Sequence, residues 1–241
     1  AAEGAVDAAN TLKPMLAQTA DDLEDAFVRI RPAAVEWKLD GARIQVHRSG
    51  GEVRAFTRNL AEITDRVPEI VEAVLELPVD AAVLDGEAIA LQEDGRPRTF
   101  QATMSRFGTK ASPGELRKRV PLSSFFFDLL HLDGEDLIDR PARERLAALD
   151  EHLPESLRVR RIETSDPAAT GRMIARLRAF AGTSDEPGTT VAPEAVIEID
   201  ITVKLATHSV DPRHPRTGQA QPLNSRIAQC RLGREIAVRA I

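Results

Sequence analysis

Apolar and polar positions alternate along several stretches of the chain, and each such stretch predicts a β-strand. From Val35 apolar residues recur at every second position, stop at Ser-Gly-Gly (49–51), and return through Val53 and Ala55. This is typical of a β-hairpin whose glycines supply positive φ at the turn. Further strands are predicted over 81–91, 123–137 (with a turn at Asp133-Gly134), 158–164 and 196–206.

Apolar residues spaced three and four apart predict helices between these strands. The apolar faces that we expect are Leu23, Phe27 and Ile30 over 17–30; Ile70, Val71, Val74 and Leu75 over 64–77; and Phe100, Met104 and Phe107 over 99–107. Residues 141–153 and 167–181 also read as helices. Because hairpins replace steady βαβ alternation, the pattern favours an α+β fold.

Composition narrows the class of protein. The 241 residues are 42% hydrophobic and 29% charged, which is typical of a soluble globular domain. No run of about 18 apolar residues is present, so we expect no membrane span. Cys230 stands alone, which excludes an internal disulfide and fits a reducing cytoplasm. A net charge of −6 argues against a broad nucleic-acid coat, although it permits a local basic groove.

The stretch Glu-Trp-Lys-Leu-Asp-Gly-Ala-Arg (36–43) holds the first candidate for chemistry. In a strand, Glu36, Lys38 and Asp40 share one face. One interpretation is a solvated surface with ion pairs that contribute roughly 0–1 kcal/mol. Gly41 favours a different interpretation, a binding site, because a glycine beside a strand often marks close approach of a backbone or ligand. Arg43 adds a fork suited to phosphate or ribose oxygens.

Three later stretches extend this candidate. Arg58 follows the hairpin, Asp85 and Glu87 share a strand face, and an aromatic run ends at Phe127 just before Asp128. Taken singly, Asp-Gly-Glu is typical of a turn and a phenylalanine run is typical of a core. Taken together and in this order, they indicate a nucleotide site with a lysine nucleophile, arginines for phosphate, a carboxylate for ribose or metal, and an aromatic plane for the base.

Residues 38–43 match the pattern K-x-D-G-x-R of the covalent nucleotidyltransferases. The surrounding residues resemble an ATP-dependent DNA ligase of bacterial or archaeal type. The resemblance covers roughly residues 12–181. The stretches that carry it, in order, are 12–17, 36–48, 56–64, 83–91, 100–108 and 125–137.

The resemblance implies a covalent nucleotidyltransferase fold, ATP-grasp-like, with two antiparallel sheets flanked by helices and the nucleotide in the cleft between them. It also implies a role for each matching residue. Lys38 takes AMP from ATP, Glu36 reads the adenine amino group, Arg43 and Arg58 hold ribose and phosphate, Phe127 stacks on adenine, Glu87 contacts the ribose hydroxyl and a metal ion, Asp40 and Gly41 shape the loop, Lys204 contacts ATP, and Glu198 joins the metal site.

The implied reaction uses ATP and Mg²⁺, for which Mn²⁺ can substitute. Lysine must lose its proton to attack, and its ordinary pKa is about 10.4. Nearby positive charge from Arg43, Arg58 and the metal lowers the pKa of the lysine, which favours the uncharged amine. The lysyl-AMP then passes AMP to the 5′-phosphate of nicked double-stranded DNA, and the 3′-hydroxyl displaces AMP. This chemistry serves DNA repair, replication and recombination, and we expect a cytoplasmic monomer.

The carboxyl end departs from the family pattern. The family carries a glutamate-glycine motif ending in lysine and then two lysines two apart, whereas Glu198–Lys204 is one residue longer and lacks the glycine. We therefore expect an adenylation core over 1–182 and a poorly matched remainder of that domain over 183–241. The oligonucleotide-binding (OB-fold) and N-terminal DNA-gripping domains are expected to lie outside this fragment, which would be adenylated but seal nicks poorly.

Other functions stay open on the sequence alone. An RNA ligase or an mRNA capping guanylyltransferase shares K-x-D-G, and capping enzymes use GTP. An NAD-dependent ligase is disfavoured because that family lacks an arginine at the position of Arg43. A nucleotide-binding module without chemistry, or a purely structural domain in which Lys38 is an ordinary surface residue, also fits the pattern.

Overall fold

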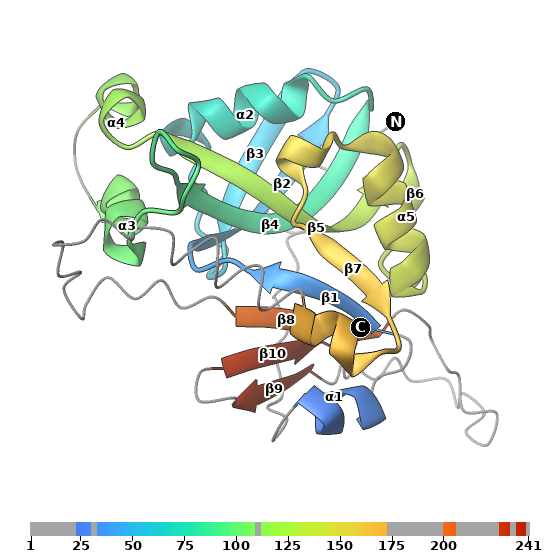
Figure 1. Ribbon diagram of the computed structural model, residues 1–241. Helices are drawn as coiled ribbons and strands as arrows, with labels where there is room; N and C mark the ends of the chain where they lie inside the picture. The colour runs from blue at the N-terminus through green and yellow to red at the C-terminus, as the bar shows by residue number, and fades with distance from the viewer. Residues whose placement is uncertain are drawn as a thin grey trace, which may run out of the picture.

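The strands form two antiparallel layers, shown in Figure 1. The computed structural model describes residues 23–29, 33–108, 112–172, 200–205, 227–231 and 235–239. One layer is a five-stranded sheet in the order β3-β2-β4-β5-β6. Its strands are β2 (Ala42–Ser49), β3 (Glu52–Thr57), β4 (Ala81–Ala90), β5 (Leu122–Leu132) and β6 (Glu135–Asp136).

The other layer is built around strand β1 (Ala33–Lys38), which pairs with β7 (Arg161–Thr164) on one side and β8 (Asp200–Leu205) on the other. Strands β9 (Ile227–Arg231) and β10 (Glu235–Arg239) form an antiparallel pair, and β10 lies beside β8 in Figure 1. The α+β class with two antiparallel sheets is therefore confirmed. Strand β10 occupies a stretch to which the sequence pattern assigned no element.

The predicted hairpin is strands β2 and β3, joined through residues 49–51. Gly50 has φ +57°, a conformation that side chains other than glycine rarely adopt, so the glycine sets the turn as expected. The turn is also held from outside, because the Gly50 amide donates to the Asp80 carbonyl at 2.6 Å.

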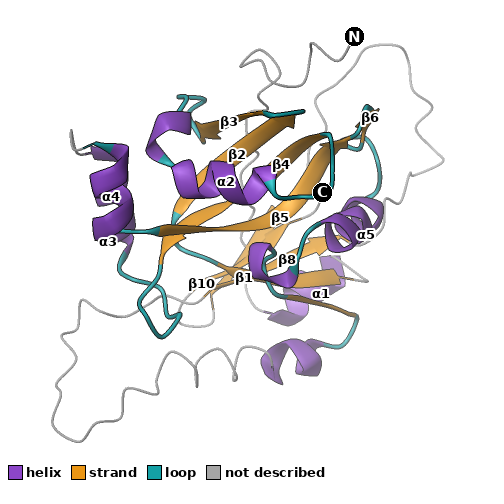
Figure 2. Ribbon diagram, turned by 90° about the horizontal axis from the view of Figure 1, so that it is seen from above, coloured by secondary structure: helices purple, strands orange, loops and turns teal. Residues whose placement is uncertain are grey.

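Helices lie around the layers, and Figure 2 views the arrangement from above. They are α1 (Leu23–Arg29), α2 (Pro68–Leu75), α3 (Phe100–Gly108), α4 (Pro113–Arg119) and α5 (Ala142–His152), with the 3₁₀ turns η2 (Thr64–Arg66) and η3 (Glu155–Leu157). Residues 167–172 are helical as predicted, and 173–181 lie outside the described residues. No described helix has the length and apolar character required to cross a membrane.

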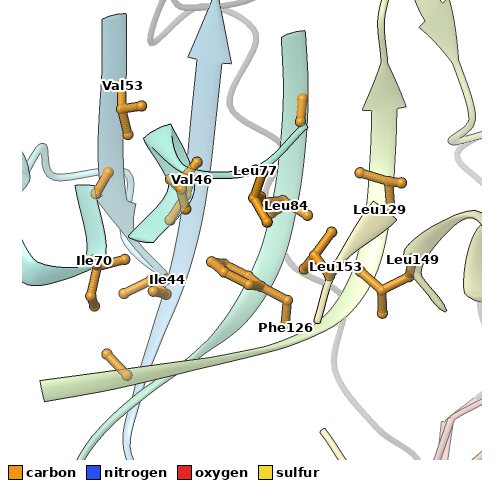
Figure 3. Packing of buried hydrophobic residues seen from close by; sticks show 14 of the residues in the cluster. Ile44, Val46, Val53, Ile70, Leu77, Leu84, Phe126, Leu129, Leu149 and Leu153 are labelled. Atoms are coloured by element: carbon orange, nitrogen blue, oxygen red, sulfur yellow. The ribbon is translucent and has the colours of Figure 1, made fainter. Parts of the chain in front are cut away.

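One face of the five-stranded sheet packs against α2 and α5 to form the core, seen in Figure 3. Phe126 of β5 is fully buried, with Ile44 of β2, Leu84 of β4 and Leu149 of α5 in the same cluster. Burying each such side chain contributes about 1.5–3 kcal/mol. The opposite face of this sheet is thereby left for polar side chains.

Two expectations about apolar faces are wrong. Leu75 ends α2 and is 37% exposed, while Phe100 and Met104 of α3 are 41% and 38% exposed. Helix α3 instead buries Arg106, whose guanidinium donates to the carbonyls of Val120 and Arg66 and to Glu69. The buried guanidinium anchors the helix by its polar side, and Phe100 and Met104 turn outward.

Candidate active site

Strand β1 brings Glu36 and Lys38 into a protected position. Glu36 is only 2% exposed and Lys38 is half-buried. Pairs on both sides of β1, with β7 and β8, remove it from the sheet edge. The interpretation of these residues as an ordinary solvated surface is therefore wrong for Glu36, whereas Asp40 is exposed as a surface residue would be.

The chain crosses from one layer to the other between Lys38, the last residue of β1, and Ala42, the first of β2. Gly41 lies in this crossing and packs against β4. A Cβ built on Gly41 would stand 2.4 Å from the Ala88 carbonyl oxygen and 3.1 Å from Cγ of Glu87. Three residues of extended chain span at most about 10 Å, which limits how far Lys38 can lie from Gly41.

Arg43 and Glu87 stand opposite each other in the β2–β4 pairing. The guanidinium of Arg43 nevertheless binds Asp85, because its Nε and Nη2 donate to the two carboxylate oxygens at 3.0 and 2.6 Å. The pair is largely buried, with side-chain exposures of 18% and 11%. This bidentate arrangement fixes the plane of the guanidinium.

The carboxylates around Arg43 together change its pKa more than its burial does. Burial alone would lower the pKa of the guanidinium, but the charge and hydrogen bonds of Asp85, with smaller contributions from Glu87 and Asp128, raise the pKa above its ordinary value. Arg43 therefore stays cationic at any working pH. Its Cζ lies 5.3 Å from the centroid of the Phe127 ring, a cation–π distance.

Phe127 reaches this position through an irregularity in β5. The pairing runs from Asp85 opposite Asp128 to Gly86 opposite Phe126, so Phe127 is the extra residue of a β-bulge. Bulges often re-aim a side chain beside a functional site. Here the bulge lets Phe126 enter the core while Phe127 meets Arg43.

The bulge is held from behind by helix α5. Arg145 is 2% exposed, and its Nε and Nη2 donate to the carboxylate of Asp128 at 2.8 and 3.1 Å. Its Nη1 also donates to the Arg140 carbonyl at 2.7 Å. The sequence pattern missed Arg145, because an arginine within an amphipathic helix looks like a solvated charge. It also missed the pairing of Asp85 with Arg43. The only signal for that pairing was the presence of two carboxylates at alternate positions of one strand.

The remaining expected site residues are Arg58, Lys204 and Glu198. Arg58 is exposed in the turn after β3, at the same end of the sheet as Arg43. In β8, Lys204 is opposite Ala34 in register, two positions along β1 from Glu36. Glu198 lies outside the described residues. Arg43, Asp85, Glu87 and Phe127 are thus gathered near the end of β1.

Comparison with known proteins identifies the family. The family described as the ATP dependent DNA ligase domain matches residues 14–178, more than half of the chain. The chain belongs to this family. A protein of Anaeromyxobacter sp. (strain Fw109-5) named Probable DNA ligase is 56% identical over 163 residues, covering 68% of this chain and 31% of the relative. One of the same name from Mycolicibacterium gilvum (strain PYR-GCK) is 50% identical, covering 80% and 38%.

A solved structure supports the same fold. The mycobacterial DNA ligase D complexed with ATP and MES has a TM-score of 0.54 at 18% identity, covering 95% of this chain and 60% of that one. The chain of this ATP-dependent DNA ligase domain spans about a third of the length of the curated relatives it matches. The predictions of family and fold are confirmed.

Proposed function

We propose that this ligase-family domain transfers AMP from ATP to Lys38 and serves in sealing nicked double-stranded DNA. The observation that carries the proposal is the seating of Gly41 on β4 beside Glu87. In this proposal, that contact holds the lysine-bearing end of β1 toward the face where Arg43 and Phe127 meet. A nucleophile, a fixed cation, a carboxylate and an aromatic ring would then border one space between the two layers.

The residues suit an adenine nucleotide. The ring of Phe127 offers a stacking surface for the base, and the buried carboxylate of Glu36 suits the exocyclic amino group of adenine. Guanine carries a carbonyl oxygen at that position, which a carboxylate repels. Arg43 and Arg58 would hold ribose and phosphate oxygens, and Lys204 would reach ATP from β8.

The transfer is an exchange at the α-phosphorus. The uncharged amine of Lys38 donates its lone pair, a nitrogen–phosphorus bond forms, the bond to the β-phosphate oxygen breaks, and pyrophosphate leaves. The amine proton goes to solvent. The DNA 5′-phosphate then takes AMP from Lys38, and the 3′-hydroxyl displaces AMP to join the strand.

The donor set fits Mg²⁺ held mainly by the substrate. No cluster of three or more histidine, cysteine, aspartate or glutamate side chains that could hold a metal occurs in the described parts of the chain. Mg²⁺ commonly binds one or two carboxylates together with substrate phosphates. Since Arg43 occupies Asp85, Glu87 is the β4 carboxylate for that role, and Glu198 is a second candidate. When bound, Mg²⁺ or Mn²⁺ would neutralise the phosphates and stabilise departing pyrophosphate.

The proposed partners follow from the family. The matched relatives are about three times as long as the aligned segment. We assign 1–182 to the adenylation core and 183–241 to the remainder of that domain, and we assign DNA gripping to OB-fold and N-terminal domains outside these residues. We further propose a cytoplasmic monomer acting in repair, replication and recombination.

Intact-mass spectrometry tests the proposed transfer. The chain is incubated with ATP and Mg²⁺, beside a Lys38→Arg variant that keeps the positive charge but cannot act at neutral pH. One AMP adduct on the wild-type chain and none on the variant supports the function. A GMP adduct formed with GTP, and no AMP adduct formed with ATP, would instead indicate a guanylyltransferase.

A further inference from the structure

Arg43 has two carboxylates within reach and pairs with the one that is not directly opposite. The strand register sets Arg43 opposite Glu87, while Asp85 stands opposite Gln45. Yet both hydrogen bonds of the guanidinium go to Asp85. Diagonal neighbours across antiparallel strands are about 7–8 Å apart, which a long side chain spans. Arg43 therefore leans along β4, away from its cross-strand neighbour.

This orientation also decides what Phe127 can present. The guanidinium carbon of Arg43 lies 5.3 Å from the ring centroid, so the cation covers one face of the ring. A ring has two faces, and a base cannot stack on the one that Arg43 covers. The direction in which Arg43 points thus excludes one side of the ring from a nucleotide.

We propose that Asp85 is a positioning residue: by holding Arg43 against one face of Phe127, it keeps Arg43 away from Glu87 and keeps the purine off that face. The inference rests on the proposed function and deepens it. Without the negative charge of Asp85, Arg43 turns to Glu87, the carboxylate assigned to ribose and metal, and both contacts are lost together.

The hydrogen-bonding capacity of Arg43 is consistent with this role. A guanidinium carries five N–H groups, and the bidentate pair with Asp85 uses two of them. The three that this pair does not use are available to phosphate oxygens. Because Asp85 is only 8% exposed, solvent screens the pair weakly, and the orientation is held before any ligand binds.

A double-mutant cycle on the whole chain tests the competition for Arg43. Asp85→Asn keeps the shape and removes the charge, Glu87→Gln removes the competing carboxylate, and the double variant combines them. The readouts are the single-turnover rate of AMP transfer to Lys38 and the ATP concentration that gives half the maximal rate. Asp85→Asn is expected to slow transfer about tenfold or more and to raise the half-saturating ATP concentration.

Coupling between the substitutions is the decisive result. If Arg43 has already captured Glu87 in the Asp85→Asn protein, adding Glu87→Gln slows transfer far less than it does in the wild-type chain. Glu69→Gln is the matched control, because it breaks another buried ion pair, Glu69 with Arg106 at 2.8 Å, away from the site. This control should lower the melting temperature and leave the half-saturating ATP concentration unchanged.

Independent, multiplying effects of the two substitutions would overturn the role of Asp85 while leaving the proposed function standing. A wild-type chain that takes up no AMP would overturn both. Should Asp85→Asn fail to fold, NMR of the Arg43 Nε–H group in the Glu87→Gln variant decides. An unchanged signal supports pairing with Asp85, and a signal lost with Glu87 contradicts it.

Discussion

Gly41 and Ala88 approach each other so closely that no side chain fits between them. A Cβ on Gly41 would stand 2.4 Å from the Ala88 carbonyl oxygen, with Cγ1 of Ile89 at 2.8 Å. This contact joins the crossing after β1 to strand β4 of the other layer. It sets how near Lys38 comes to Glu87, so it connects the fold directly to the proposed chemistry.

Substituting Gly41→Ala should displace the crossing and slow AMP transfer. The backbone oxygen of Ala88 cannot swing away, so the two strands must separate, at a cost of about 1–3 kcal/mol in the free energy of unfolding. Chemical denaturation and adduct formation measure the two effects. Gly51→Ala is the control, because nothing lies within 4 Å of a Cβ there. Equal behaviour of the two variants would remove Gly41 from this role.

Glu87→Ala should slow transfer about ten- to a hundredfold, the usual effect of losing a contact between charged groups. The expected reason is loss of ribose and metal contacts, so the defect should shrink as Mg²⁺ concentration rises. Single-turnover rates over a Mg²⁺ titration measure it. Glu52→Ala, which removes an exposed carboxylate paired with Arg54 on the hairpin, serves as the control. An unaltered rate would exclude Glu87 from the site.

Arg145→Met should destabilise the domain by about 3–5 kcal/mol, because it leaves the buried carboxylate of Asp128 without its cation. Urea denaturation gives the change in the free energy of unfolding. Arg117→Met is matched to it, since Arg117 pairs with Glu72 in an exposed ion pair that solvent screens, so its loss should change stability little. Similar losses of unfolding free energy in both variants would mean that the buried Arg145–Asp128 pair stabilises the domain no more than an exposed pair does.

Helix α4 should loosen in acid. Hydrogen bonds from the Ser112 side chain and backbone favour the Glu115 carboxylate and lower its pKa. A carboxyl whose pKa is lowered by folding stabilises above its ordinary pKa of about 4.3, and that contribution disappears as pH falls through the folded value. NMR shifts of α4 during an acid titration report the change. Glu115→Gln should abolish this pH dependence, and its persistence would assign the effect to another group.

Four Asp-Gly pairs show how far the sequence could predict this fold. The pairs at 40–41, 85–86, 94–95 and 133–134 look alike in sequence, but only the last two make turns, where Gly95 has φ +81° and Gly134 has φ +92°. Gly86 lies inside β4, where a Cβ would come within 2.7 Å of the Phe125 carbonyl oxygen. Local pattern predicts turns well, whereas close approach depends on which strand comes to lie alongside.

The same distinction applies to the site and to helix α3. Period two correctly placed Asp85 and Glu87 in one strand, and the match to K-x-D-G-x-R singled out Lys38. Pairing of Arg43 with Asp85 rather than Glu87 depends on register across strands distant in sequence, which periodicity does not encode. Arg106 in α3 is likewise buried by partners from other elements, so its burial could not be inferred from the spacing of apolar residues alone.

Peptide mapping of the adenylated chain tests the central claim most directly. The chain contains five lysines, Lys13, Lys38, Lys110, Lys118 and Lys204. After incubation with ATP and Mg²⁺, tandem mass spectrometry should find AMP on the peptide containing Lys38 and on no other. AMP attached to a different lysine, or a chain that stays unmodified, would contradict the account.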